Sequence, residues 1–423
     1  MNGYIVPSIC GRTYLYGINA DASVSSRIVA ALTVQINPAV MQESLGRAFE
    51  RFPHFSVGLC MDGDKVLFRP VHGPVPVFHA SDVHPECFGD PALGGYLIKV
   101  SYIHKTVFFD FHRALSDEPG MLSFVKSVLF DYLEHEGFPL ITDGSVKLSG
   151  SECFKAEGED AMVRLDDLPA SRPVWYMDAK ATVPSAADES VEEVVHLRIP
   201  AAKLRKEHSD IVNIPVTYIA PLFSHAVYEI AGGNMEAGEY VVASVQVNLR
   251  PYYPSPSMLP YHTSVYLAYN RNLSDYPYAT VFMSQKKLLE AQLKPDTLAY
   301  SAQQKIAAAQ WASEAPAGET DSRFAAIQEK TRSKFTYDIA GVGHVNLPEC
   351  MQRLVTELYP VMPSPGAGFS VAIGLFRNEV GVTISGRRNA AKVAGRLVEL
   401  LQANDIDAYL ADRYTFVPMR NSK

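Results

Sequence analysis

Residues with side chains able to do chemistry stand together in one short stretch of this sequence. Residues 107–111, which are apolar except for Asp110, are followed within seven positions by His112, Arg113, Ser116, Asp117 and Glu118. The run has the composition of a strand, and apolar residues recur at helical spacing after residue 120. An imidazole at such a strand-to-helix junction could act as a general base. The junction is therefore the first candidate for a functional site.

The stretch resembles the His-His-x-x-x-Asp-Gly signature of the chloramphenicol acetyltransferase-like superfamily. This superfamily includes the condensation domains of peptide synthetases, plant acyltransferases and the bacterial alcohol acetyltransferase-like proteins. With Asp117 as the aspartate of the signature, the two histidine positions fall on His112 and Arg113, and the glycine position falls on Glu118. The second histidine is the general base of the family, so the resemblance places Arg113 at that position and implies a structural role for Asp117.

Arginine changes the chemistry expected at the position of the base. A guanidinium stays protonated at physiological pH, so Arg113 cannot accept a proton from a hydroxyl or an amine. It could be a surface side chain, a plug that fills the tunnel of the fold, or an anchor for a phosphate or carboxylate ligand. A cation at the tunnel centre needs an anion. We expect either a nearby carboxylate, with Glu118 and Asp117 as the local candidates, or a bound anionic ligand.

His112 is the other catalytic candidate at the junction. It could serve as the base in place of Arg113. Neighbouring residues of a strand point to opposite faces, however, so a tunnel-facing Arg113 predicts that His112 faces away from the tunnel.

Two later stretches extend the resemblance. Residues 248–255, Asn-Leu-Arg-Pro-Tyr-Tyr-Pro-Ser, are similar to an Asn-Leu-Arg-x-x-x-Pro-Ser element of the alcohol acetyltransferase-like branch, which implies that Arg250 pairs with Asp117. Residues 335–348 form the third similar stretch, and within it residues 340–343, Ala-Gly-Val-Gly, stand where many relatives carry Ser-Asn-x-Gly in the tunnel wall. The resemblance implies that Gly341 and Gly343 line the tunnel. His344 could approach the same cleft or be a structural histidine.

Composition limits the kind of protein. A chain of 423 residues with 47% hydrophobic and 20% charged residues is typical of a well-packed α/β protein of two domains. The formal charge of −8, without a long run of lysine and arginine, argues against a nucleic-acid partner. No stretch approaches the ~18 apolar residues that span a bilayer, and no leader pattern is visible. Five single cysteines suggest buried thiols in a reducing compartment, and no metal-ligand spacing is present. We expect a cytoplasmic protein without a metal or a membrane span.

The hydrophobic pattern predicts the elements that position the junction. In the first part of the chain it predicts a strand over 27–34, a helix over 38–51, hairpins over 55–70 and 97–111, and a helix from the junction to about 136. Periodicity is weak from 137 to 190. The later part has expected strands over 191–199, 239–247 and 408–416, a hairpin over 369–385, and helices over 214–230, 273–293, 295–312 and 389–403. We place the domain boundary near residue 185, which gives domains of 1–185 and 186–423.

The resemblance implies a fold and two hypotheses for function. The fold is expected to be α/β and of the CoA-dependent acyltransferase-like type, with two domains, a mixed sheet in each and a tunnel between them. As an enzyme, the protein would transfer an acyl group from a thioester of coenzyme A, or of the phosphopantetheinyl arm of a carrier protein, to a small hydroxyl or amine acceptor, with no tightly bound cofactor. The alternative is a non-catalytic relative that binds a ligand or a partner. Arg113, Glu118 and the missing Ser-Asn pair favour this alternative.

Overall fold

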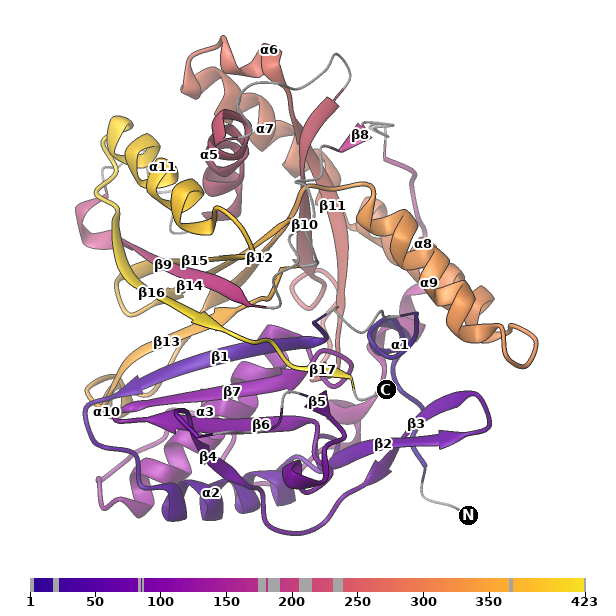
Figure 1. Ribbon diagram of the computed structural model, residues 1–423, viewed down its shortest axis with the longest axis vertical. Helices are drawn as coiled ribbons and strands as arrows, with labels where there is room; N and C mark the ends of the chain where they lie inside the picture. The colour runs from indigo at the N-terminus through magenta and orange to yellow at the C-terminus, as the bar shows by residue number, and fades with distance from the viewer. Residues whose placement is uncertain are drawn as a thin grey trace.

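The computed structural model describes residues 4–17, 23–82, 85, 87–173, 180–181, 191–204, 215–230, 239–364 and 368–421. Two large sheets organise these residues, one in each half of the molecule (Figure 1). The domain boundary predicted near residue 185 lies outside the described residues.

The first sheet carries the junction. Its strands lie in the order β13 (Val355–Val361), β1 (Ser25–Leu32), β7 (Thr106–His112), β6 (Ile98–Ile103) and β4 (Val77–His79). Neighbouring strands are antiparallel except β4 and β6. Helices α2 (Pro38–Arg51) and α3 (Glu118–His135) cover one face of the sheet (Figure 1). Strand β13 comes from the later part of the chain, so the first sheet is completed by residues more than 300 positions away from β1.

The second sheet is larger and mixed. Its strands lie in the order β11 (His262–Tyr269), β10 (Glu239–Asn248), β12 (Tyr337–His344), β14 (Phe369–Phe376), β15 (Glu379–Gly386), β9 (Glu192–Pro200) and β16 (Tyr409–Phe416), and the short β8 (Lys180–Ala181) also pairs with β10. Strand β12 is parallel to both β10 and β14, and the other pairs along this order are antiparallel. Helices α5 (Pro215–Ile230) and α11 (Ala390–Ala403) lie over one face (Figure 1). These parallel and antiparallel neighbours confirm the mixed sheet expected from the resemblance.

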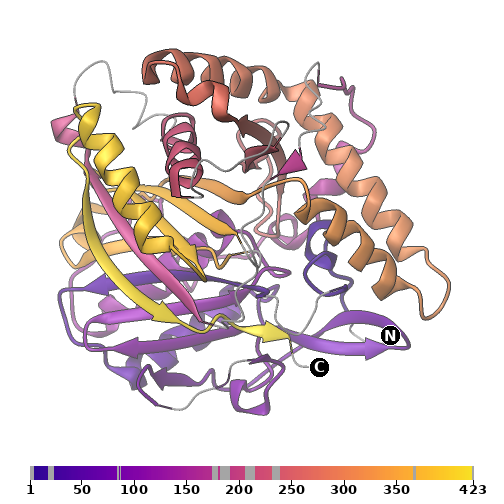
Figure 2. The same ribbon diagram turned by 45° about the horizontal axis from the view of Figure 1, so that its top comes forward.

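A pair of long helices lies to one side of the two sheets. Helices α8 (Pro295–Ser313) and α9 (Thr320–Arg332) run side by side, next to the short α1 (Ile9–Arg12) (Figures 1 and 2). The remaining elements are α6 (Arg271–Ser274), α7 (Tyr278–Gln292), α10 (Glu349–Gln352), the hairpin of β2 (Val57–Asp62) and β3 (Lys65–Pro70), and the short pair β5 (Cys87–Phe88) and β17 (Arg420–Asn421). No helix in the described ranges is both long and apolar enough to cross a membrane.

Most of the longer elements agree with the sequence-based expectations, but several elements were not predicted. Helix α2 coincides with the predicted 38–51 because Pro38 occupies its first turn and the Asn37 side chain caps it by accepting from the Ala39 N–H. Strands β4, β11, β12 and β13 and helix α9 had no counterpart in the prediction, nor had the short elements α1, α10, β5, β8 and β17. Only Cys10 is fully buried, whereas the other four thiols are partly exposed, so the expectation of buried thiols was wrong for those four.

Candidate functional site

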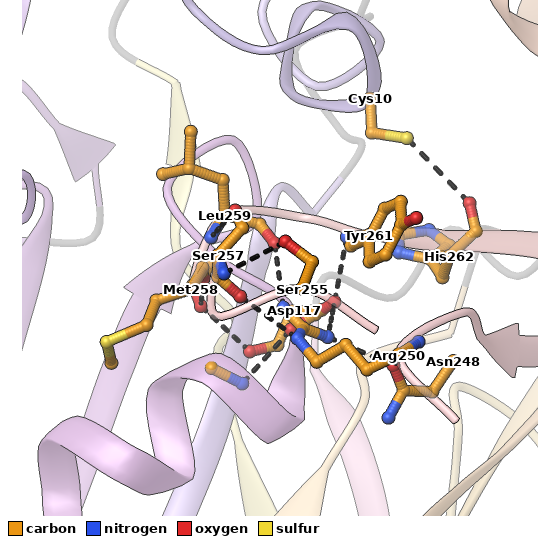
Figure 3. A network of polar contacts seen from close by, with 12 residues as sticks. Cys10, Asp117, Asn248, Arg250, Ser255, Ser257, Met258, Leu259, Tyr261 and His262 are labelled. Carbon is orange, nitrogen blue, oxygen red and sulfur yellow. Dashed lines mark hydrogen bonds and ion pairs between the residues drawn. The ribbon is translucent and has the colours of Figure 1, made fainter. Parts of the chain in front are cut away.

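The aspartate of the signature joins the two halves of the molecule. Asp117 caps α3 through Oδ1, which accepts from the Gly120 N–H. Its Oδ2 accepts from Nη1 of Arg250 at 2.8 Å and from the Tyr261 N–H at 2.9 Å (Figure 3). The Asp117 side chain is 4% exposed and that of Arg250 is 18% exposed. The ion pair implied by the resemblance is thus present and well shielded from solvent.

Arg250 has a hydrogen-bond acceptor for each of its guanidinium nitrogens. Nε donates to the Ser257 carbonyl and Nη2 to the Leu259 carbonyl, while Nη1 also donates to Oδ1 of Asn248 (Figure 3). The segment between β10 and β11 is therefore held to the start of α3 by one arginine that makes four hydrogen bonds. Fixing this segment also fixes the backbone that enters β11.

His112 is buried away from the central cavity. Its Nδ1 accepts from the Ala114 N–H at 3.0 Å, and Nε2 lies 2.8 Å from Oδ1 of Asn421. The ring also packs against Phe88. Burial lowers the pKa of His112 to about 4, and the hydrogen bond to Asn421 opposes this only in part. A neutral imidazole with both nitrogens engaged holds the junction to the C-terminal strand.

Arg113 lines a cavity of about 940 Å³. Its guanidinium carbon lies 4.6 Å from the ring centroid of Tyr14, and Nη2 is 3.5 Å from Oε1 of Gln246. Burial lowers its pKa, but Tyr14, Glu118 and Asp338 outweigh that effect and the pKa is raised above the ordinary value. Arg113 therefore remains a cation at the cavity wall.

The local carboxylates expected to pair with Arg113 are engaged elsewhere. Oε1 of Glu118 accepts from the Ser26 hydroxyl, and Asp117 is bound to Arg250. Among the described residues no carboxylate lies within ion-pair distance of Arg113. Neither Glu118 nor Asp117 forms a direct ion pair with Arg113. Glu118 is nevertheless close enough for its charge to raise the pKa of Arg113, as does Asp338.

The cavity lies where the two halves of the molecule meet. Tyr14 and Arg113 line it from the N-terminal half, strands β10, β11 and β12 line it from the second sheet, and α8 and α9 complete the wall. This is where the resemblance predicted a tunnel between domains. Residues from both halves must be in place before the cavity exists.

A row of polar side chains on the second sheet faces this cavity. In the register of the strands, Gln246 is opposite Ser264, and Ser244 lies between Tyr266 and Asp338. Residues two apart on a strand share a face, and cross-strand partners are neighbours on it, so these side chains form one patch. All of them line the cavity. The sequence shows that one face of β10 is polar, because Ser244, Gln246 and Asn248 alternate with valines. It does not show that this face lines the cavity.

Two titratable side chains in this wall were missed by the sequence analysis. Asp338 is 9% exposed, and burial raises its pKa, although Ser244, Arg113 and Gln246 act to lower it. His262 is 8% exposed, and its Nδ1 is buried without a hydrogen-bond partner among the described residues. His262 lies outside the similar stretches. Asp338 lies within the third of them but is not one of its Ser-Asn-x-Gly positions, so only the fold shows that it reaches the cavity.

The glycines and the histidine predicted to line the tunnel lie further along β12. Gly341 is half-buried, and a side chain there would meet Val216 of α5. Gly343 has a φ of +72° at an irregularity in the pairing with β14, and both Gly343 and His344 are exposed. None of the three residues lines the cavity described above; β12 contributes Asp338 instead.

Comparison with known proteins shows the fold and nothing finer. No protein-family model and no curated protein matches the chain. Among solved structures, polyketide synthase associated protein 5 from Mycobacterium tuberculosis matches with a TM-score of 0.61 and 11% identity, over 95% of this chain and 98% of the other. F. graminearum TRI101 complexed with coenzyme A and T-2 mycotoxin matches with a TM-score of 0.62 and 10% identity, over 96% and 99%.

A third match extends the comparison to peptide synthetases. The first condensation domain of the CDA synthetase matches with a TM-score of 0.56 and 12% identity, over 94% of this chain and 95% of the domain. The aligned parts cover both chains almost from end to end, so the likeness of fold covers both sheets. The chain therefore has the two-domain fold of condensation domains and TRI101.

Proposed function

We propose that this protein binds a coenzyme A thioester in the central cavity and transfers its acyl group to a small hydroxyl or amine acceptor. The observation that carries the proposal is the charge of the cavity wall. Its described lining includes the cations Arg113, Lys305, Lys330, Arg332 and Lys334, and Asp338 is the one carboxylate among these lining residues. In a chain with a formal charge of −8, such a concentration of cations favours an anionic ligand.

The cations near the end of α9 are poorly compensated. Burial lowers the pKa of Arg332, and burial together with Lys330 lowers that of Lys334. Arg332 donates to Oε1 of Gln328, an uncharged acceptor, at 3.3 Å. Cations held near one another without carboxylates gain most from a ligand that brings phosphate groups. The phosphates of coenzyme A supply that charge, and TRI101 has been described in complex with coenzyme A.

The positions of these side chains suggest which part of the cavity would hold each part of the substrates. The three cations of α9 and its end would hold the phosphates, and Arg113 lies at the signature position where the acyl group of a family substrate reacts. The polar patch of Ser244, Gln246 and Asp338 would then face the acceptor. A non-catalytic protein that only binds the thioester is the second candidate, because Arg113 cannot act as a base.

Calorimetric titration with coenzyme A tests the proposal. We expect binding by the unaltered protein and roughly 100-fold weaker binding by the triple variant Lys330→Gln, Arg332→Gln, Lys334→Gln, since each charge-assisted contact is worth ~1 kcal/mol. The matched control removes the same charge from exposed positions, with Lys105→Gln, Lys155→Gln and Lys392→Gln. Dephospho-coenzyme A and pantetheine, which carry fewer or no phosphates, should bind progressively more weakly. Absence of binding, or an equal loss in the two triple variants, would refute the proposal.

A further inference from the structure

The cavity has a second candidate for proton transfer besides the residues of the signature. We infer that His262 is the general base of the acyl transfer, on the wall opposite the position where the family carries its base. The inference rests on the proposed function, because it needs a thioester and an acceptor in the cavity. It also gives Arg113 a role that a guanidinium can perform.

The geometry leaves the His262 ring free while its backbone is fixed. His262 is the first residue of β11, lies opposite Asn248, and lines the cavity on the same face as Ser264. Its carbonyl accepts from Nζ of Lys305 at 3.4 Å and from Sγ of Cys10 at 3.8 Å, and the Tyr261 N–H just before it is bound to Asp117 (Figure 3). No hydrogen bond joins the ring to another described residue, and Nδ1 is buried without a partner.

A buried imidazole without a partner is uncommon, because an unsatisfied polar group costs ~1–3 kcal/mol. Among the described residues, the fully buried His112 and His196 have ring hydrogen bonds to Asn421 and Thr383. Nε2 of the partly buried His54 also lacks a partner, but His54 does not line the central cavity. The contrast distinguishes a ring that holds the structure together from one that is available to a ligand. A hydroxyl or amine in the cavity would supply the missing partner.

The surroundings keep the His262 ring neutral. Burial lowers its pKa well below 6.5, and the charges of Lys305 on α8, Arg113 after β7 and Arg250 after β10 lower it further. The other titratable group packed against this residue is the Cys10 thiol of α1, whose pKa is raised by burial. A neutral imidazole is the form that accepts a proton, so His262 is ready to act as a base at neutral pH.

The proposed reaction needs no further reagent. His262 takes the proton of the acceptor hydroxyl or amine. At the same time the oxygen or nitrogen of the acceptor bonds to the carbonyl carbon of the thioester. The carbonyl electrons move to the oxygen, and Arg113 stabilises the negative charge that develops there. The carbonyl then re-forms, the carbon–sulfur bond breaks, and the thiolate leaves with the proton that His262 returns. Arg113, which cannot act as a base, thus supplies a permanent positive charge.

Variants separate this role from a structural one. The assay follows free thiol released from acetyl- and octanoyl-coenzyme A, with butanol, butylamine or water as acceptor. His262→Gln should bind coenzyme A with a Kd within threefold of the unaltered protein yet transfer the acyl group at least 100-fold more slowly. The control His72→Gln, an exposed histidine outside the cavity, should behave as the unaltered protein does. His262→Asn provides a second test if the glutamine variant unfolds.

The pH dependence gives a readout that a structural histidine would not change. Because the base must be neutral, kcat/KM falls as pH drops through its pKa, and that fall should lie well below pH 6.5 in the unaltered protein. Arg113→Met removes one of the charges that lower this pKa, so the acid limb should move toward pH 6.5. Transfer by His262→Gln within tenfold of the unaltered rate, or an acid limb that Arg113→Met does not move, would overturn the inference alone. If the unaltered protein transfers no acyl group, both the inference and the catalytic part of the proposed function are overturned. The binding part of the proposed function is tested separately by titration with coenzyme A.

Discussion

Replacing Arg250 with leucine should destabilise this protein more than the loss of a single surface charge could. The change removes the 2.8 Å ion pair with Asp117, whose side chain is only 4% exposed. It also removes donors from the carbonyls of Ser257 and Leu259. Asp117 keeps its bonds to two backbone N–H groups but loses its countercharge.

The expected magnitude follows from which charge is left behind. Removing one partner of a buried ion pair costs about 3–5 kcal/mol, because the other charge stays desolvated. Partial exposure of Arg250 lets water reach some of the freed carbonyls, so we expect ~3 kcal/mol. Adding Asp117→Asn removes the stranded charge, and the double variant should recover ~1–2 kcal/mol relative to the sum of the single variants.

Urea unfolding at pH 7 measures these differences. The matched control is Arg353→Leu, which breaks a 2.9 Å ion pair with Glu349 whose side chains are 78% and 84% exposed. That exposed pair should contribute less than ~1 kcal/mol. The reasoning fails if Arg250→Leu destabilises no more than Arg353→Leu, or if the Asp117 and Arg250 substitutions are simply additive.

Three further predictions test other parts of the structure by urea or thermal unfolding. Gly120→Ala should destabilise by ~2 kcal/mol or more, because its Cβ would lie 2.3 Å from the Met258 carbonyl oxygen, while Gly46→Ala in open space on α2 should stabilise by up to ~1 kcal/mol. Stability should fall as the pH drops from 6.5 toward 4. In the unfolded chain His112 becomes protonated near its ordinary pKa, whereas in the folded protein burial lowers its pKa to about 4. In the variant His112→Gln, the part of this loss that is due to His112 should be absent. Glu157→Gln should cost ~3–5 kcal/mol, because Glu157 is the buried partner of Arg51; equal stability of the variant would show that the charge is not needed.

The sequence predicted elements whose signals are local. Helix α2 has its cap, its proline and its apolar stripe within the fifteen residues 37–51, and β7 ends one residue from its predicted end. Strand β13 was not predicted as part of the first sheet, because its partner β1 lies about 320 residues earlier in the chain. No local pattern encodes that pairing.

The candidate site, like the fold, was predicted only in part from the sequence. The order of the motifs was enough to bring Asp117 and Arg250 together, because each motif fixes a position in the fold as well as a residue type. His262 lies outside the similar stretches, and Asp338 lies within the third of them without being one of its motif positions. Which face of β11 or β12 meets the other half of the molecule is decided by tertiary packing, so their place in the cavity became visible only in the structure.

The long-range pairing of β1 with β13 has a consequence for synthesis on the ribosome. About 320 residues separate the two strands, and at 5–20 residues per second the ribosome needs roughly 16 to 64 s to make them. During that interval β1, with the apolar segment Ile28–Leu32, is an open sheet edge able to pair with other nascent chains. Expression at low temperature slows translation and prolongs this exposure, so chaperone supply rather than cooling alone should decide how much protein is recovered in soluble form.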